Sequence, residues 1–285
     1  MYVMTGRSFT TLPPTQLVHI RPQGSLSGPS FSELWAYREL LYFLTWRDVK
    51  IRYKQTFIGV AWALLQPVVT TAIFTIIFSS WGRFETGTVP YPVFVLSGLL
   101  IWLFTHSSVT MSSNSFVSNV NLVTKVYFPR LIVPIAATLA GVLDMVISAV
   151  LLLLLMAYYG VGISMSALVA PIFLVVGFIQ AAAVGTLLSA LNVRFRDVKF
   201  ALPFLLQVWM IASPVFYPVE VLGEKWRAVF AINPLVGTIE GLRSALFGRP
   251  FEMSILAVSL ASTVVLCLIS IIVFNRMEDD FADVI

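Results

Sequence analysis

"TWRDVKIRYKQTFIGVAW", residues 45–62, changes character at its midpoint. Arg47, Lys50, Arg52 and Lys54 lie close together in its first half, and the next charged residue is Arg83. An apolar helix of about 20 residues is long enough to cross the hydrocarbon core of a bilayer. The stretch therefore predicts a basic segment at a membrane surface that leads directly into a spanning helix.

The composition extends this interpretation to the whole chain. Of its 285 residues, 58% are hydrophobic and only 11% are charged, and the mean hydropathy is +0.90. Soluble globular domains usually carry about 25% charged residues. Backbone polar groups have no water partner in hydrocarbon, so only helices and closed barrels span, and long uninterrupted apolar runs favour helices. We expect an all-α polytopic membrane protein.

Six apolar runs are bounded by charges or by Pro and Gly, and we expect six transmembrane helices. They cover roughly 58–80, 91–112, 131–158, 167–191, 200–219 and 254–274. In the fourth, Ala181, Gly185 and Ser189 form a small-residue face for close helix packing. Before the last run, Asn233 and Pro234 are expected to begin a helix that Gly248 ends. Being too short to span, it is expected to be re-entrant or interfacial, on the outer side.

The distribution of cations sets the orientation. With the N-terminus inside, thirteen of the 18 Lys and Arg residues fall on the inner side and five on the outer side. The outer five are Arg83, Lys225, Arg227, Arg243 and Arg249. This bias follows the positive-inside rule and places both termini in the cytoplasm.

The segment before the first run predicts a separate element. From Leu34 to Thr56 there is no Pro or Gly, and six apolar residues share one helical face opposite three cations. They are Leu34, Tyr37, Leu40, Leu41, Leu44 and Ile51, opposite Arg47, Lys50 and Lys54. Trp35, Tyr42, Trp46 and Tyr53 form a second, aromatic strip. We expect a Pro-rich cytoplasmic segment (1–30), an amphipathic interface helix (31–56) and a six-span domain (57–285).

Chemistry-bearing residues are scarce. No phosphate-binding loop of the G-x-x-x-x-G-K-[ST] type occurs, and a single cysteine, Cys267, excludes an intrachain disulfide. No metal site is expected, because neither histidine has a second ligand at metal spacing. Within the spans only Asp144 and His106 are ionisable, and Asp144 is either a structural partner of a neighbouring helix or a functional carboxylate.

Several ordered blocks resemble the permease subunit of bacterial polysaccharide ATP-binding-cassette exporters, most closely the O-antigen type. The blocks are "WAYRELLYFLTWRDVKIRYKQTFIGVAWALLQP" (35–67), "KVYFPRLIVP" (125–134), "LNVRFRDVKFALPFLLQVWMIASPVFYP" (191–218), "INPLVGTIEGLRSALFG" (232–248) and "RMEDDFADVI" (276–285). The resemblance covers nearly all of the chain from Glu33 onward. It implies a homodimer in the bacterial inner membrane, bound to two separate ATPase subunits that hold ATP and Mg. It implies no cofactor on this chain and no nucleic acid.

The resemblance also implies site residues. The cargo, an undecaprenyl-diphosphate-linked polysaccharide, would enter beside the interface helix, where Arg47, Lys50, Arg52 and Lys54 would meet its headgroup. The first and fifth spans would line a channel whose aromatic residues are Trp62, Phe74, Phe78, Phe204, Trp209, Phe216 and Tyr217. Segments 116–130 and 193–199 would couple to the ATPase through Asn121, Lys125, Tyr127, Phe128, Arg130, Arg194, Arg196 and Lys199.

Other functions stay open from the sequence. A capsule or teichoic-acid exporter shares much of the pattern. A flippase that works without ATP is disfavoured by the single intramembrane carboxylate, because proton-coupled carriers use several such groups in relay. A membrane-bound glycan or lipid transferase would need a cluster of interfacial carboxylates or histidines, and the chain lacks such a cluster.

Overall fold

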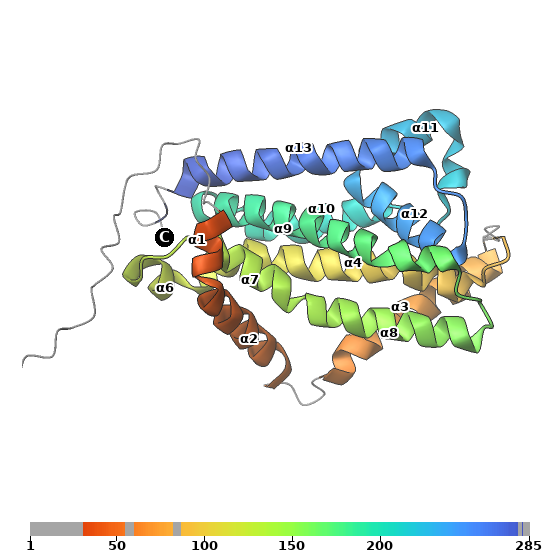
Figure 1. The fold of residues 1–285 in the computed structure, drawn as a ribbon, viewed down its shortest axis with the longest axis horizontal. Helices are drawn as coiled ribbons and strands as arrows, with labels where there is room; N and C mark the ends of the chain where they lie inside the picture. Colours follow the sequence, from red (N-terminus) through yellow and green to blue (C-terminus); the bar gives the residue numbers. More distant parts are fainter. Residues whose placement is uncertain (1–30, 55–59, 82–86, 279–280, 282–285) are drawn as a thin grey trace, which may run out of the picture.

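The computed structural model describes residues 31–54, 60–81, 87–278 and 281, and its regular structure there is entirely helical (Figure 1). The predicted segment 1–30 lies outside the described residues. The longer helices are α2 (Arg38–Lys54), α3 (Val60–Trp81), α4 (Tyr91–Ser113), α7 (Ile132–Ala140), α8 (Val142–Tyr158), α9 (Ala170–Arg194), α10 (Val198–Ile211), α12 (Pro234–Phe247) and α13 (Met253–Glu278). The shorter ones are α1 (Phe31–Ala36), α5 (Ser115–Ser118), α6 (Val120–Lys125), η1 (Met165–Val169), η2 (Val219–Leu222) and α11 (Gly223–Phe230).

Five stretches of helix are long and apolar enough to cross a membrane, against the six that the sequence predicts. They are Ala61–Phe78, Tyr91–Ser113, Ile132–Tyr158, Met165–Arg194 and Met253–Glu278. The predicted span 200–219 is instead the 14-residue helix α10, which ends at Ile211. Pro214 lacks an N–H and disfavours helical geometry at the residue before it, which explains why the helix stops here.

The predicted span 131–158 is interrupted. Helices α7 and α8 meet at Gly141, which packs directly against Ser108 of α4. A Cβ at Gly141 would overlap the Ser108 hydroxyl, so this glycine lets the chain pass close to α4 where the helix breaks.

Helix α4 is the centre of the bundle. About 78% of its spanning window is buried, against 11% for α3. Its most extensive contact is with α9. The predicted small-residue face of α9 is confirmed there, because Ala181 and Ser189 are fully buried. A Cβ at Gly185 would come within 2.6 Å of Ser112, so the two helices touch backbone to side chain.

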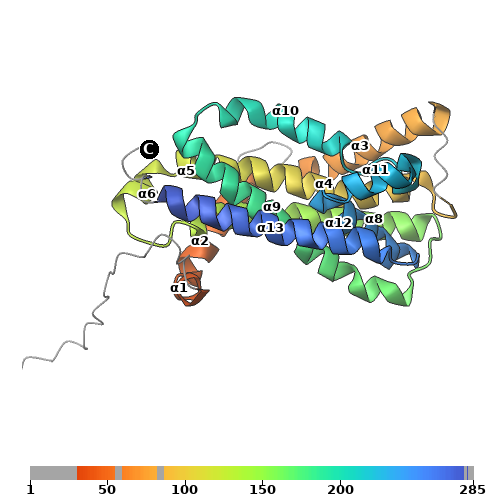
Figure 2. The same ribbon diagram turned by 90° about the horizontal axis from the view of Figure 1, so that it is seen from above.

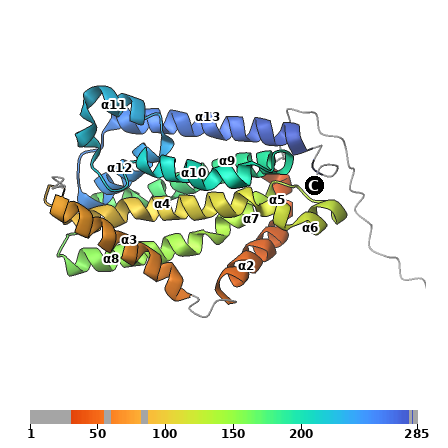
Figure 3. The same cartoon turned by 180° about the vertical axis from the view of Figure 1, so that it is seen from behind.

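The two ends of the bundle carry different small elements. Helices α2 and α6 lie at one end, and α11 and α12 lie at the other (Figures 1 and 3). Helix α2 runs obliquely to the bundle and packs on α7, and α1 is separated from it at Tyr37. Leu34, Tyr37, Leu40 and Leu41 are partly buried and pack, with buried Leu44, against the cluster of Phe116, Phe128 and Ile132.

Two details of the predicted interface helix differ. Ile51, placed on the apolar face by its spacing, is 56% exposed. Trp35, Tyr42 and Trp46 are exposed, but Tyr53 faces the bundle. The apolar face therefore ends near Leu44, because beyond it α2 diverges from the helices that bury it.

Helix α12 matches its prediction. The Asn233 side chain accepts a hydrogen bond from Leu235 N at 3.1 Å, Pro234 is the first helical residue, and Gly248 ends the helix at φ +66°. These are the N-cap and C-cap arrangements that the residue types favour.

Candidate functional site

A groove of 740 Å³ opens between α2, the start of α3, α4 and α5. Most of its lining residues have polar side chains, although apolar atoms make up the larger part of the wall area. The polar residues are Arg47, Asp48, Arg52, Gln66, His106, Ser107, Thr110, Asn114, Ser115, Ser118 and Asn119. Neutral hydrogen-bonding groups outnumber charges, so the groove suits a ligand rich in hydroxyl or phosphate oxygens.

Arg52 and Asp144 join α2 to α8 beside this groove. Arg52 forms an ion pair with Asp144, and its Nη1 also donates to Ser107 Oγ at 3.0 Å. The Tyr53 hydroxyl donates to Asp144 as well. Burial, together with this hydrogen bond, raises the pKa of the Tyr53 phenol, so the donor stays protonated at all physiological pH values. Asp144 thus contacts a neighbouring helix, which is the arrangement that the structural one of its two predicted roles expects.

The four cations predicted to meet the headgroup differ in their partners. Arg47 binds the adjacent Asp48 through Nε at 3.0 Å and Nη2 at 2.8 Å. Lys50 is exposed with its Nζ 5.3 Å from the centre of the Trp46 ring, and Lys54 is exposed at the end of α2. Both arginines are therefore already neutralised, whereas neither lysine of this set has a carboxylate partner among the described residues.

His106 lines the groove from α4, and its ring lies 6.0 Å from that of Trp102. Among the described residues, no group of three or more His, Cys, Asp or Glu side chains is placed to hold a metal ion.

Three of the predicted channel aromatics meet at the far end of the bundle. The Phe216 ring stacks on Phe74 at 5.0 Å and on Phe78 at 5.6 Å, with interplanar angles of 5° and 19°. Phe74 and Phe78 belong to α3, and Phe216 follows α10. The structure thus joins the first predicted span and the end of the fifth in one aromatic stack, and Figure 2 shows α3 and α10 on the same side of the bundle.

The other four predicted channel residues do not join this stack in the same way. Trp62 and Phe204 are 60% and 67% exposed. Trp209 donates from Nε1 to Asn233 Oδ1 at 2.9 Å and meets Trp102 edge to face. Tyr217 is buried and its hydroxyl donates to the Ile211 carbonyl at 2.9 Å.

The residues predicted to couple to an ATPase separate into two groups. Most are exposed at the end of the bundle that carries α6: Asn121, Lys125, Tyr127, Arg194, Arg196 and Lys199. Phe128 is 4% exposed in a core cluster, and Arg130 donates to the Glu278 carbonyl and lies 5.9 Å from the Phe281 ring. Phe128 and Arg130 therefore pack near the end of α13 and Phe281, while the exposed group is accessible to a partner.

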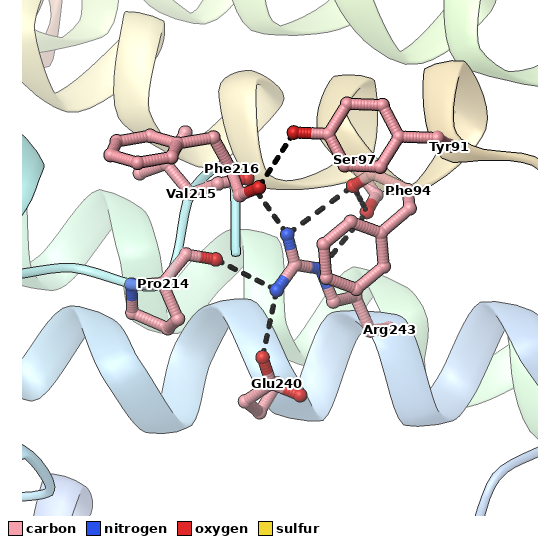
Figure 4. Close-up of polar contacts among 8 residues, drawn as sticks. All are labelled: Tyr91, Phe94, Ser97, Pro214, Val215, Phe216, Glu240 and Arg243. Carbon is pink, nitrogen blue, oxygen red and sulfur yellow. Dashed lines mark hydrogen bonds and ion pairs between the residues drawn. The ribbon is translucent and has the colours of Figure 1, made fainter. Parts of the chain in front are cut away.

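One ion pair was not predicted from the sequence. Arg243 is counted above among the outer cations, but its side chain is fully buried and pairs with Glu240 at 2.7 Å (Figure 4). The spacing of three residues between Glu240 and Arg243 could have indicated the pair, since residues three apart are neighbours on a helix.

These features define the class as a multi-pass helical membrane protein with a polar groove at one end and an aromatic stack at the other. Residues 39–247 match the model of the ABC-2 type transporter membrane family, and the chain belongs to this family.

Its relatives are polysaccharide transport proteins by name. The chain is 30% identical over 255 residues to the O-antigen export system permease protein RfbA of Myxococcus xanthus, covering 88% of this chain and 97% of that protein. It is 25% identical over 248 residues to the protein of the same name from Klebsiella pneumoniae, covering 87% and 95%. The polysialic acid transport protein KpsM of Escherichia coli is 24% identical over 215 residues, covering 70% and 78%.

Proposed function

We propose that this chain is the transmembrane subunit of an ATP-driven exporter that moves lipid-linked O-antigen polysaccharide across the bacterial inner membrane. The observation that carries the proposal is the match over 97% of the Myxococcus permease. The polar groove and the aromatic stack, which lie at opposite ends of α4, agree with a path for a hydroxyl-rich chain. The subunit itself is no enzyme in this proposal, and ATP and Mg bind its partner.

The proposed assembly is a homodimer with two ATPase subunits, and both termini are cytoplasmic. The exposed residues of α6 and of segment 194–199 would face the ATPases. The outer apolar surface of α3 would face lipid or the second copy. Its large exposed side chains include Trp62, Val68, Ile73 and Ile76.

We further propose that the chain crosses the membrane six times. Asn192 Nδ2 donates to the Ser113 carbonyl at one end of α4, and the Phe216 carbonyl accepts from the Tyr91 hydroxyl at the other. Residues 193–216 therefore run the full length of α4. Helix α10 supplies about 21 Å at about 1.5 Å per residue, and the connecting residues before and after it supply the rest.

A capsule exporter is the second candidate, since the chain is also similar to KpsM. The lower coverage, 70% of the chain against 88%, favours O-antigen. Deleting the gene and analysing the glycan that accumulates in the cytoplasm would decide between them. O-antigen that is complete but unexported supports the proposal, and normal surface O-antigen contradicts it.

The groove's role can be tested on its two lysines. With Lys50 and Lys54 each contributing about 1 kcal/mol toward an anionic lipid, Lys50→Gln with Lys54→Gln would weaken headgroup binding by more than about tenfold. We expect surface O-antigen to fall at matched membrane levels of the protein. Lys225→Gln removes an exposed lysine from α11 at the other end and serves as the control. Unchanged export in the double variant would show that the two lysines do not bind the headgroup and serve only as topology signals.

A further inference from the structure

Arg243 is a cation buried without access to solvent, and its side chain binds three separate segments (Figure 4). On its own helix, Nη1 donates to Glu240 at 2.7 Å. On α4, Nη2 donates to the Phe94 carbonyl and Nε to Ser97 Oγ, both at 3.3 Å, and the guanidinium lies 3.6 Å from the centre of the Phe94 ring. The third segment is the turn after α10.

The turn supplies two of the shortest of these contacts. Arg243 Nη1 donates to the Pro214 carbonyl at 2.7 Å, and Nη2 donates to the Val215 carbonyl at 2.8 Å. Both residues are buried and lie outside any helix, so these carbonyls need donors from elsewhere. A planar guanidinium can serve two adjacent carbonyls and a carboxylate together, whereas a lysine ammonium has three donors at one point.

Helix α4 is shaped to receive this turn. A Cβ at Gly98 would overlap the Val215 carbonyl oxygen and would lie 2.8 Å from Arg243 Nη2. Glycine is the residue that permits so close an approach of two backbones. Gly98 leaves space for the turn, and Arg243 supplies its hydrogen-bond donors. These two independent features place the turn at the same position on α4.

Phe216, the last residue of the turn 214–216, belongs to the aromatic stack. The Phe216 carbonyl accepts from the Tyr91 hydroxyl at 2.8 Å, and its ring lies against Phe74 and Phe78 of α3. Holding the backbone of residues 214–216 therefore determines where the Phe216 ring meets α3. An apolar pair in place of Glu240 and Arg243 could be equally stable, but it would leave the turn without donors.

We propose that Arg243 is a positioning residue for export: it fixes the turn 214–216 on α4 and so holds Phe216 in the aromatic stack that the exported glycan passes. The role of the stack in export rests on the proposed function, whereas the positioning of Phe216 does not.

The test uses a charge-balanced variant, because Arg243→Met alone would leave Glu240 buried and unpaired. Arg243→Met with Glu240→Gln removes both charges and keeps the packing volume close to that of the native pair. Gly98→Ala displaces the turn from the opposite side and keeps the ion pair. Gly177→Ala is the matched control, since its Cβ would meet Ile101 and Thr238 only at ordinary distances of 3.5 and 3.6 Å.

The first measurement is independent of transport. In a chain with Cys267→Ala, Phe74→Cys and Phe216→Cys, a short thiol cross-linker reports the proximity of α3 and the turn. We expect the cross-linking rate to fall about tenfold in the charge-balanced variant and in Gly98→Ala, the order that one charge-assisted hydrogen bond supports, and to be unchanged in Gly177→Ala. An unchanged rate in both test variants would overturn the positioning role.

The second measurement is the amount and length of surface glycan in cells, with all native aromatics present and membrane levels matched. We expect the charge-balanced variant and Gly98→Ala to export less, while Gly177→Ala exports normally. Full export despite lost cross-linking would show that the stack has no part in export and would overturn that half of the proposal. If the unmodified chain restores no O-antigen to a deletion strain, the proposed function fails, and the cross-linking result still decides the positioning of Phe216.

Discussion

Arg52 and Arg243 each form an ion pair and further contacts with other segments, and they differ in what surrounds them. Arg52 is 30% exposed beside the groove, and its pair with Asp144 joins α2 to α8. Arg243 is 1% exposed at the other end, and its pair with Glu240 is only part of a set of contacts with the turn and α4. An ion pair with a partly exposed arginine contributes less to stability and can exchange partners, whereas a pair whose arginine is fully buried is costly to break. The groove end is therefore suited to admitting a charged group, and the stack end to keeping one geometry.

The largest expected effect is the change in the free energy of unfolding when each of these two arginines is replaced. Arg243→Met should reduce the free energy of unfolding by about 3–5 kcal/mol, because Glu240 loses the partner of a fully buried cation and the Pro214 and Val215 carbonyls lose their donors. Arg52→Met should cost about 1 kcal/mol, because Arg52 is 30% exposed and Asp144 keeps the hydrogen bond from the Tyr53 hydroxyl. Thermal unfolding of the detergent-purified proteins measures both. Equal losses would mean that burial does not distinguish the two pairs.

Two tryptophans, one packed and one exposed, test the same contrast between buried and exposed groups with smaller expected changes in stability. Trp209→Ala should cost about 2–3 kcal/mol, because it removes packing against Trp102 and the hydrogen bond to Asn233. Trp62→Ala should change stability by no more than about 0.5 kcal/mol, because the ring is 60% exposed.

Export measurements then assign the roles of these two aromatics. A defect in Trp62→Ala at normal stability would mark a surface that contacts cargo or a second copy. Normal export would make Trp62 a lipid-facing residue. For Trp209→Ala, loss of export is interpreted only at matched membrane levels, and a stable variant would contradict the packing role given to Trp209.

What the sequence predicted well depends on local chemistry. The caps of α12 at Asn233 and Gly248 follow from backbone groups within a few residues, and hydropathy alone located the five long spans. The family match confirms the resemblance found in the motifs. The short length of α10 was missed because its apolar run continues past the point where Pro214 ends the helix.

What the sequence could not predict depends on distant partners. Tyr53 and Asp144 are 91 residues apart in the chain, and the aromatic spacing that placed Tyr53 on an exposed strip contains nothing about α8. Arg243 was counted on the outer side of the membrane because it lies between the fifth and sixth predicted spans, and that count contains nothing about burial. Its acceptors on the turn and on α4 come from segments 28 to 149 residues away, and only the fold brings them together.

The last prediction concerns the link between α2 and α8. Asp144→Asn keeps an acceptor for the Tyr53 hydroxyl but removes the charge that Arg52 meets, so we expect a loss of about 1 kcal/mol. Asp48→Asn is the control, because it breaks an ion pair that lies within α2. A Lys54→Cys reporter in the Cys267→Ala background measures how freely the end of α2 moves. Maleimide labelling should be about fivefold faster with Asp144→Asn and unchanged with Asp48→Asn, since about 1 kcal/mol corresponds to that factor. Equal labelling in the two variants would show that the Asp144 contact does not hold α2. The groove would then depend on the packing of Leu44 and its neighbours for its shape. The Arg52–Asp144 pair would then have no role in holding α2, in contrast to the role of Arg243 in holding the turn.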